Sequence, residues 1–204
     1  MLGAGGHAKV LLEILLINGE KISGITCPEL DKKGTLILET PVIGGDEEIF
    51  THPPHSIRLV NGVGSVKSTG LRHEIFNRFK GLGYTFANVT HSAAVVSHYS
   101  EVGEGAQIMA GAIIQTGCVI GDNSIINTRA SVDHDCRIGA HVHVAPGVTI
   151  CGGVRVEDGA HIGTGATVIQ GVRIGKNSVV GAGALVLRDV PEAVTVIGVP
   201  AKVV

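Results

Sequence analysis

The sequence predicts a mixed fold, with a small α/β domain over residues 1–89 and a parallel β-helix over residues 90–204. Three observations lead to this prediction. A glycine-rich opening segment precedes an amphipathic stretch, which is typical of a tight turn followed by a helix. In the second part of the chain an aliphatic residue recurs at every sixth position. No aromatic residue follows Tyr99, so the core of that part is too narrow for rings, as in a solenoid.

The first domain is expected to begin with the loop Gly3-Ala4-Gly5-Gly6-His7-Ala8, which fits the pattern G-x-G-x-x-A. A helix should follow and end at Asn18-Gly19, because the next apolar residues have helical spacing: Val10, Leu11, Ile14 and Leu15. Such a loop presents backbone N–H groups at a helix N-terminus, a favourable place for a diphosphate. A tight turn without a ligand would have the same pattern.

The rest of this domain is predicted to complete a βαβ-type half-fold, which is too short for a full dinucleotide domain. Strands are expected at residues 21–26, 57–63 and 84–89, and a second helix at residues 67–80. The apolar stripe of that helix is predicted to be Leu71, Ile75 and Phe79.

The β-helix is predicted from a six-residue period. Every sixth residue from Val96 to Val186 is Ile or Val, and a small or β-branched residue lies four positions after each. Three such hexads form one coil, so residues 18 apart should stack. Glycine occupies the third position after the aliphatic residue in nine hexads, where a corner can require positive φ, and Asn123 and Asn177 serve the same purpose.

The composition excludes several classes of protein. Of the 204 residues, 44% are hydrophobic and 17% are charged, which excludes a disordered chain. The formal net charge of −2 provides no basic field for nucleic acid, so we expect no nucleic-acid partner. No apolar run approaches the roughly 20 residues that cross a bilayer, and no signal-peptide pattern is present. Four cysteines without CxxC spacing fit reduced thiols in a reducing compartment. Together with the lack of a membrane-spanning run and of a signal pattern, this predicts a cytoplasmic protein without a membrane partner.

Three consecutive hexads have neither glycine nor asparagine at the corner position, where Arg129, Asp135 and His141 are found instead. Local departures from a structural rule are expected at functional sites. His134 is the best candidate for a general base there, because its ordinary pKa lies near neutral pH and the adjacent carboxylates can orient its ring. The alternative is that these are solvated surface residues of a regular solenoid.

The chain resembles the left-handed β-helix (hexapeptide) acyltransferases, whose characteristic ending matches Ile197-Gly198-Val199-Pro200-Ala201-Lys202. Three further segments resemble the bacterial sugar acetyltransferases of the NeuD/PglD type: residues 3–9, 41–46 and 86–93. The resemblance implies a Rossmann-like first domain, a left-handed β-helix and a homotrimer. It also implies acetyl-CoA as co-substrate, a nucleotide sugar as acceptor and no metal.

The same resemblance implies roles for individual residues. His134 would be the catalytic base and Asp135 its partner, while Asn127 would lie on the acceptor side. The acetyl-CoA site would comprise His143, Gly152, Thr164 and Ala182. The loop residues Gly3, Gly5, Gly6 and His7 would bind the nucleotide sugar, with its diphosphate and uridine.

The predicted function is therefore acetyl transfer from acetyl-CoA, most simply to the 4-amino group of a UDP-linked amino sugar. O-acetylation of a sugar or of sialic acid and a non-catalytic, sugar-nucleotide-binding trimer are the alternatives. A zinc hydratase of the γ-carbonic anhydrase type would use His98 and His134, but its third ligand would fall on Gly139. A dinucleotide oxidoreductase is disfavoured because the chain has no second catalytic domain.

Overall fold

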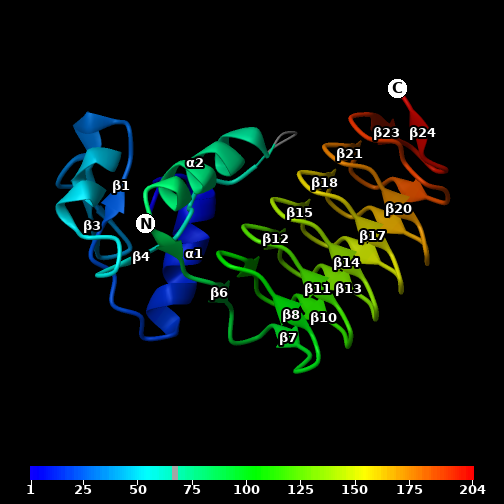
Figure 1. The fold of residues 1–204 in the computed structure, drawn as a ribbon, viewed down its shortest axis with the longest axis horizontal. Coiled ribbons are helices and arrows are strands. Elements are labelled where there is room, and N and C mark those ends of the chain that lie inside the picture. Colours follow the sequence, from blue (N-terminus) through cyan, green and yellow to red (C-terminus); the bar gives the residue numbers. More distant parts are fainter. Residues whose placement is uncertain (66–68) are drawn as a thin grey trace.

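The computed structural model describes residues 1–65 and 69–204, and it has the mixed fold that the sequence predicts (Figure 1). A small α/β part lies beside a parallel β-helix, and α1 (Gly6–Ile17) and α2 (Gly70–Gly81) lie between the N-terminal strands and the coils. The expected boundary between residues 89 and 90 falls inside strand β6 (Val89–Thr90), which already pairs with the next coil.

The N-terminal part is built on short parallel strands. Strand β1 (Ile25–Thr26) pairs with β3 (Thr40–Gly44), and β4 (Arg58–Leu59) pairs with β5 (Thr85–Phe86). Leu2 connects the two pairs through parallel bridges to Thr26 and Asn61. Strand β2 (Leu36–Ile37) is antiparallel to β3, and two 3-10 helices cover Leu30–Lys32 and Asp46–Thr51. β1, β4 and β5 lie within the predicted ranges of residues 21–26, 57–63 and 84–89, but each has only two paired residues.

Helix α1 confirms the first predicted helix, and it connects the two parts of the molecule. Asn18 ends the helix by donating its N–H to the carbonyl of Ile14. Its buried face contacts Val60 of the N-terminal part, and it belongs to one apolar cluster with three β-helix residues: Val89, Met109 and Ile125. Val10, which was expected on this face, is exposed.

Helix α2 begins at Gly70, and its predicted start at residues 67 and 68 lies outside the described residues. The predicted stripe is partly wrong, because Leu71 is 61% exposed while Arg72, Phe76 and Phe79 are buried. The difference has a physical cause: α2 packs against the β-helix as well as the sheet. Phe76 lies edge-on to the ring of His141 in the β-helix.

The β-helix consists of three sheets that are parallel except for the C-terminal strand of one of them. Most neighbouring strands are 18 residues apart, as the stacking of Ile113, Ser131 and Thr149 shows. The six-stranded sheet comprises β7 (Val95–Val96), β10 (Ile113–Ile114), β13 (Ser131–Val132), β16 (Thr149–Ile150), β19 (Thr167–Val168) and β22 (Leu185–Val186). The five-stranded sheet comprises β8 (Glu101–Val102), β11 (Val119–Ile120), β14 (Arg137–Ile138), β17 (Arg155–Val156) and β20 (Arg173–Ile174). The eight-stranded sheet comprises β6, β9 (Gln107–Ile108), β12 (Ile125–Ile126), β15 (His143–Val144), β18 (His161–Ile162), β21 (Val179–Val180), β23 (Thr195–Ile197) and β24 (Lys202–Val203).

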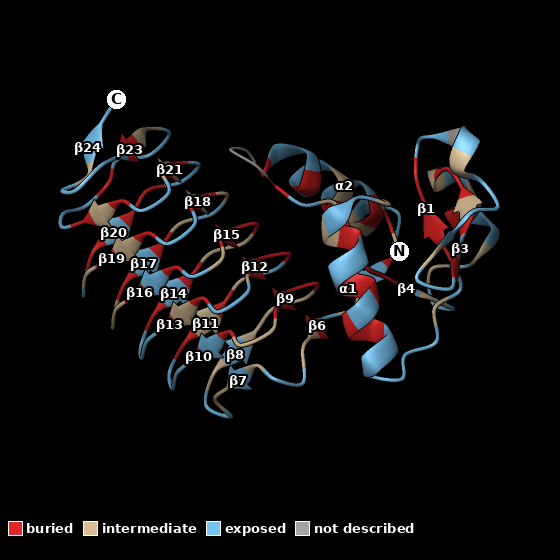
Figure 2. Ribbon diagram, turned by 180° about the vertical axis from the view of Figure 1, so that it is seen from behind, coloured by how far each residue is buried: buried red, intermediate tan, exposed pale blue. Residues whose placement is uncertain are grey.

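The interior of the coils is filled by the two predicted inward positions of each hexad, which form one continuous apolar core. Buried residues recur along the coils from residue 105 onward (Figure 2). All nine predicted corner glycines have positive φ, and so do Asn123 and Asn177. Arg129, Asp135 and His141 adopt the same left-handed conformation, with φ of 56°, 60° and 60°. The left-handed corner conformation is therefore retained at positions that lack glycine, and this costs backbone strain.

Candidate active site

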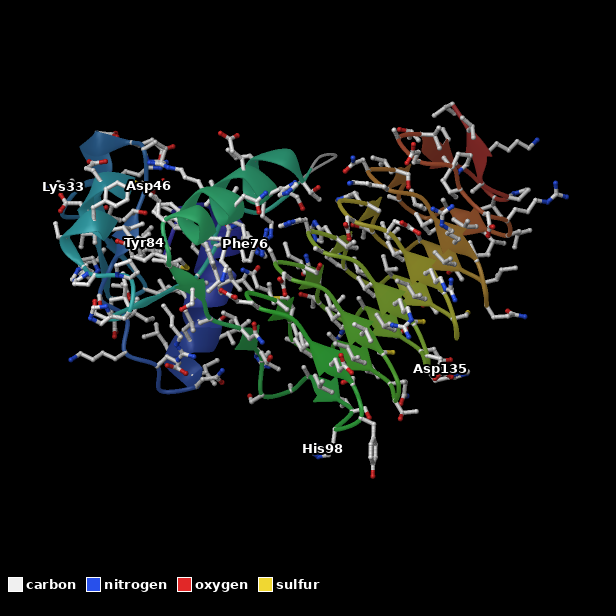
Figure 3. All side chains as sticks on the ribbon, in the orientation of Figure 1. Lys33, Asp46, Phe76, Tyr84, His98 and Asp135 are labelled. Carbon is white, nitrogen blue, oxygen red and sulfur yellow. The ribbon has the colours of Figure 1, made fainter. Side chains whose placement is uncertain are left out.

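The strongest candidate site lies at the corner between β13 and β14, where residues 133–136 connect the six-stranded and five-stranded sheets. Asp133 Oδ1 accepts a hydrogen bond of 2.8 Å from the backbone N–H of His134. His134 Nδ1 lies 2.8 Å from Asp135 Oδ2. Asp135 lies at the edge of the β-helix that is turned away from α1 and α2 (Figure 3). The corner therefore presents an oriented imidazole on an exposed edge.

The carboxylates at this corner determine the state of the imidazole. The hydrogen bond to Asp135, and after it the charge of Asp133, raises the pKa of His134 above its ordinary value. With Nδ1–H donated to Asp135, the lone pair of the neutral ring is on Nε2. The structure thus provides the arrangement of a general base whose second nitrogen is held by a carboxylate.

The reacting nitrogen of His134 faces the next coil at Gly152. A Cβ placed on Gly152 would lie 2.6 Å from His134 Nε2, closer than any side chain permits. Only glycine at this position accommodates the ring as it stands. Gly152 was predicted to be near the acetyl donor, and the structure brings it together with the predicted base.

The other predicted acetyl-CoA residues do not lie at this corner. Thr164 and Ala182 are exposed at the corner between the eight-stranded and six-stranded sheets, on two successive coils. His143 lies within the eight-stranded sheet and is 7% exposed. Asn127 lies on the same coil, at the corner that leads from the eight-stranded to the six-stranded sheet. In a single protomer His134 is therefore separated from His143 by the width of the coil.

His143 is enclosed by hydrogen bonds from both parts of the molecule. Its Nδ1 is 2.6 Å from Ser65 Oγ, and its Nε2 is 3.0 Å from Asn127 Nδ2. Because an amide nitrogen only donates, Nε2 accepts and Nδ1 carries the proton. Burial, followed by the charges of His161 and His7, lowers the pKa of His143 to about 3. His143 is therefore neutral and fixed in one tautomer.

The glycine loop forms the predicted turn before α1. Gly3 has φ of 93°, and a Cβ there would lie 3.1 Å from Val63 Cγ2, so the position requires glycine. At Gly5 and Gly6 a Cβ would meet nothing within 4 Å, which leaves the helix N-terminus open. Gly5 provides no side-chain cap, and the first turn contains no acidic residue. The free N–H groups of this turn are thus available to an anion.

His7, in the first turn of α1, is joined to the β-helix. Its Nε2 lies 2.8 Å from Gln107 Oε1, and Gln107 Nε2 donates in turn to the carbonyl of Asn61. Since Gln107 Oε1 can only accept, Nε2 of His7 carries the proton and Nδ1 is the acceptor. Burial lowers the pKa of His7 to about 4, so the ring is neutral.

A cavity of about 610 Å³ opens beside the glycine loop, at the carboxyl ends of the N-terminal strands. Nucleotides bind at such edges in open α/β sheets. Gly3 and Val63 line it together with apolar side chains, including the half-exposed Phe50. Its polar wall carries acidic residues and one cation: Asp46, Glu47, Glu74 and Arg78.

Ser65, Gln107 and Arg72 were missed by sequence reasoning. Each is buried where the two parts of the molecule meet. Gln107 gave a weak signal, because it is a polar residue at an outward strand position near apolar neighbours. Across the described residues, no three His, Cys, Asp or Glu side chains are placed to hold a metal ion. Neither α1 nor α2, the helices found in the described chain, is long and apolar enough to span a membrane.

Comparison with known proteins gives matches over the whole chain. The family model described as bacterial transferase hexapeptide (six repeats) matches residues 99–133 and 153–188, and the hexapeptide repeat of succinyl-transferase matches residues 129–165. No curated protein matches the sequence.

Three solved structures are similar over the full length of this chain. A mutant of perosamine N-acetyltransferase from Caulobacter crescentus, in complex with CoA and GDP-perosamine, is 40% identical with a TM-score of 0.91, and the match covers 100% of this chain and 94% of that one. The acetyltransferase domain of PglB from Neisseria gonorrhoeae, in complex with acetyl coenzyme A, is 34% identical with a TM-score of 0.90, covering 100% and 97%. WeeI from Acinetobacter baumannii is 26% identical with a TM-score of 0.87, covering 100% and 97%.

Proposed function

The chain belongs to the hexapeptide-repeat acyltransferases of the NeuD/PglD type, with their left-handed β-helix, and we propose that it acetylates the amino group of a nucleotide-linked amino sugar with acetyl-CoA. The observation that carries the proposal is the imidazole of His134, oriented by Asp135 on an exposed corner with Nε2 over Gly152. The 40% identical protein in complex with CoA and GDP-perosamine supports the substrate class. A UDP-linked sugar was expected, so guanosine and uridine nucleotides are both candidates for the acceptor.

In the proposed reaction, the nitrogen of the acceptor amine attacks the thioester carbonyl of acetyl-CoA, and His134 Nε2 takes a proton from that amine. The new C–N bond forms while the C–S bond breaks, and CoA leaves as the thiolate. The proton gained by the imidazole is stabilised by Asp135, because the carboxylate already holds Nδ1–H at 2.8 Å. His134 can then return a proton to the thiolate.

We propose a homotrimer, in which the reaction centre lies between two protomers. The outward strand positions of the six-stranded sheet carry no charge: Val95, Ile113, Ser131, Thr149, Thr167 and Leu185. The same positions of the five-stranded sheet are mostly charged: Glu101, Val119, Arg137, Arg155 and Arg173. An uncharged face fits burial against a second copy better than a face with three stacked arginines.

This packing would bring the halves of the donor site together. The corner of His134 and Gly152 borders one edge of the six-stranded sheet, and the corner of Thr164 and Ala182 borders the other. If neighbouring copies meet along this sheet, the base corner of one faces the Thr164 corner of the next. A groove for the pantetheine arm of acetyl-CoA would then run along the coils between them.

The test is thiol release from acetyl-CoA with GDP- and UDP-linked 4-amino sugars and with their 4-hydroxy counterparts. We expect release with an amino sugar and a loss of roughly 10²- to 10⁴-fold in kcat for His134→Ala. His98→Ala is the matched control, since His98 holds the same corner position two coils earlier. Release with the 4-hydroxy sugars alone would indicate O-acetylation. Equal activity of His134→Ala and wild type would overturn the assignment of the base.

A further inference from the structure

Arg72 is a buried cation whose positive charge is not neutralised by any carboxylate in the described parts of the chain. Arg72 is 1% exposed, because it extends from α2 into the contact with the β-helix. Nη1 donates to the carbonyls of Asn61 at 2.8 Å and Val63 at 2.9 Å, and Nε donates to the carbonyl of Asn123 at 3.1 Å. Nη2 has no hydrogen-bond partner among residues 1–65 and 69–204. Carbonyl dipoles solvate such a charge only in part, and an unpaired buried charge is unfavourable.

The guanidinium lies directly behind the glycine loop. It binds the carbonyl of Val63, and the backbone nitrogen of Val63 is 3.4 Å from the Cβ position of Gly3. Gly62, between Val63 and Asn61, donates its N–H to the carbonyl of Leu2 at 2.7 Å. One layer of backbone therefore separates Arg72 from the loop at which α1 begins.

The charge of Arg72 reaches the first turn of α1 and the histidines around it. It contributes to the lowered pKa of His7, after the larger effect of burial, and of His143, where burial and the neighbouring histidines contribute more. No carboxylate contributes to the pKa of either histidine. Among the acidic residues of the neighbouring cavity, Asp46 accepts a hydrogen bond of 2.8 Å from the hydroxyl of Thr26 and lies 3.7 Å from Nη1 of Arg78.

We propose that the substrate supplies the missing counter-charge: the diphosphate of the nucleotide sugar binds at the glycine loop, and Arg72 attracts it from behind through its charge. Arg72 is then a positioning residue that touches no substrate atom. The N-terminal dipole of α1 and the guanidinium act on the same anion from two sides. This inference rests on the proposed nucleotide-sugar acceptor, and it adds a specificity for diphosphates over nucleosides.

The experiment compares Arg72→Gln with Arg72→Lys. Both substitutions disturb the three carbonyl contacts, but only lysine keeps the charge, so a purely structural role affects both variants alike. The affinities of GDP, GMP and guanosine, and of the uridine series, are measured by calorimetry on the full chain. We expect Arg72→Gln to lose roughly 10- to 100-fold in affinity for the diphosphate, as for one charge facing a dianion at an effective dielectric constant of about 20. Guanosine or uridine should bind unchanged, and Arg72→Lys should retain most of the diphosphate affinity.

A second variant keeps the test decisive if Arg72→Gln does not fold. Asn123→Asp keeps Arg72 and the backbone carbonyls to which it donates, and it adds a nearly isosteric carboxylate on the β-helix side. It gives up the contacts of Asn123 Nδ2 with the carbonyl of Arg72 and with Nδ1 of His141. It should weaken diphosphate binding selectively. Equal losses in Arg72→Gln and Arg72→Lys, or unchanged diphosphate affinity in Asn123→Asp, would overturn the role of Arg72. A wild-type protein that binds neither GDP nor UDP would instead overturn the nucleotide-sugar acceptor itself, and this inference with it.

Discussion

Gly152 leaves the space into which the imidazole of His134 projects, so a single methyl group there tests the geometry of the base. A Cβ on Gly152 would lie 2.6 Å from Nε2, 2.7 Å from Cε1 and 3.2 Å from Cδ2 of His134. Since non-bonded carbon atoms prefer about 3.5–4.0 Å, the ring in Gly152→Ala must move by roughly 1 Å. A displacement of about 1 Å costs a catalytic group roughly 10²-fold. We therefore expect kcat to fall about 10- to 100-fold, which corresponds to about 1.4–2.7 kcal/mol.

The adjacent Gly153 provides a matched control. Its φ is 69°, and a Cβ there would meet nothing within 4 Å. Gly153→Ala should therefore leave His134 undisturbed but lose about 1–2 kcal/mol of stability to the left-handed backbone. At about 2–4 °C per kcal/mol for a chain of this size, that loss is measurable as a lower Tm. Gly152 has no positive φ, so Gly152→Ala should change Tm much less.

The assay is thiol release under saturating acceptor, with kcat and the KM for acetyl-CoA determined separately and Tm measured by calorimetry. The expected pattern is reciprocal: Gly152→Ala loses kcat and keeps Tm, while Gly153→Ala loses Tm and keeps kcat. Wild-type kcat in Gly152→Ala would refute the geometry of the base. A change confined to the KM for acetyl-CoA would show that the methyl group obstructs the donor without moving the ring.

Three further predictions follow from the site and its surroundings. Because Asp135 raises the pKa of His134, the rise of kcat with pH should shift to lower pH in Asp135→Asn, and an unshifted profile would contradict this role. Thr149→Arg, on the uncharged face, should reduce both the oligomer seen by light scattering and the activity, whereas Arg155→Ser on the charged face should reduce neither. Burial lowers the pKa of His141 to about 4, so between pH 6.5 and about 4 the unfolded chain binds a proton that the folded chain does not. Stability therefore falls as the pH falls through this window, and His141→Asn should show a smaller fall in Tm than wild type.

The coils could be predicted from sequence because their determinants are local and repeat. A side chain at each inward position meets its counterpart 18 residues away, so the period alone identifies the core. The corner at Asp135 was also found this way, since a non-glycine residue at a corner is visible without the structure. Its positive φ of 60° shows that the repeat fixes the backbone conformation even at a residue for which that conformation is unfavourable.

The contacts between the two parts could not be predicted, because they depend on which faces meet. Leu71 fits a helical stripe as well as its neighbours do, yet α2 is rotated so that the polar Arg72 is buried. Nothing local identifies a buried arginine when its acceptors are backbone carbonyls 9, 11 and 51 residues away. The pairing of Ser65 with His143 across 78 residues is likewise a property of the assembled fold.

The position of the polar residues along the β-helix gives a further argument for a site shared between copies. Asn127, His134 and His143 all belong to one coil, although they lie on different sides of it. A symmetry axis parallel to the β-helix keeps every residue at its own height, so it can bring His134 of one copy level with Asn127 and His143 of the next. Within one protomer both nitrogens of His143 have hydrogen-bond partners, and the free lone pair of His134 is on Nε2, which faces Gly152. We therefore expect that a monomeric variant, even one that is fully folded and retains nucleotide binding, has a base without an acceptor beside it.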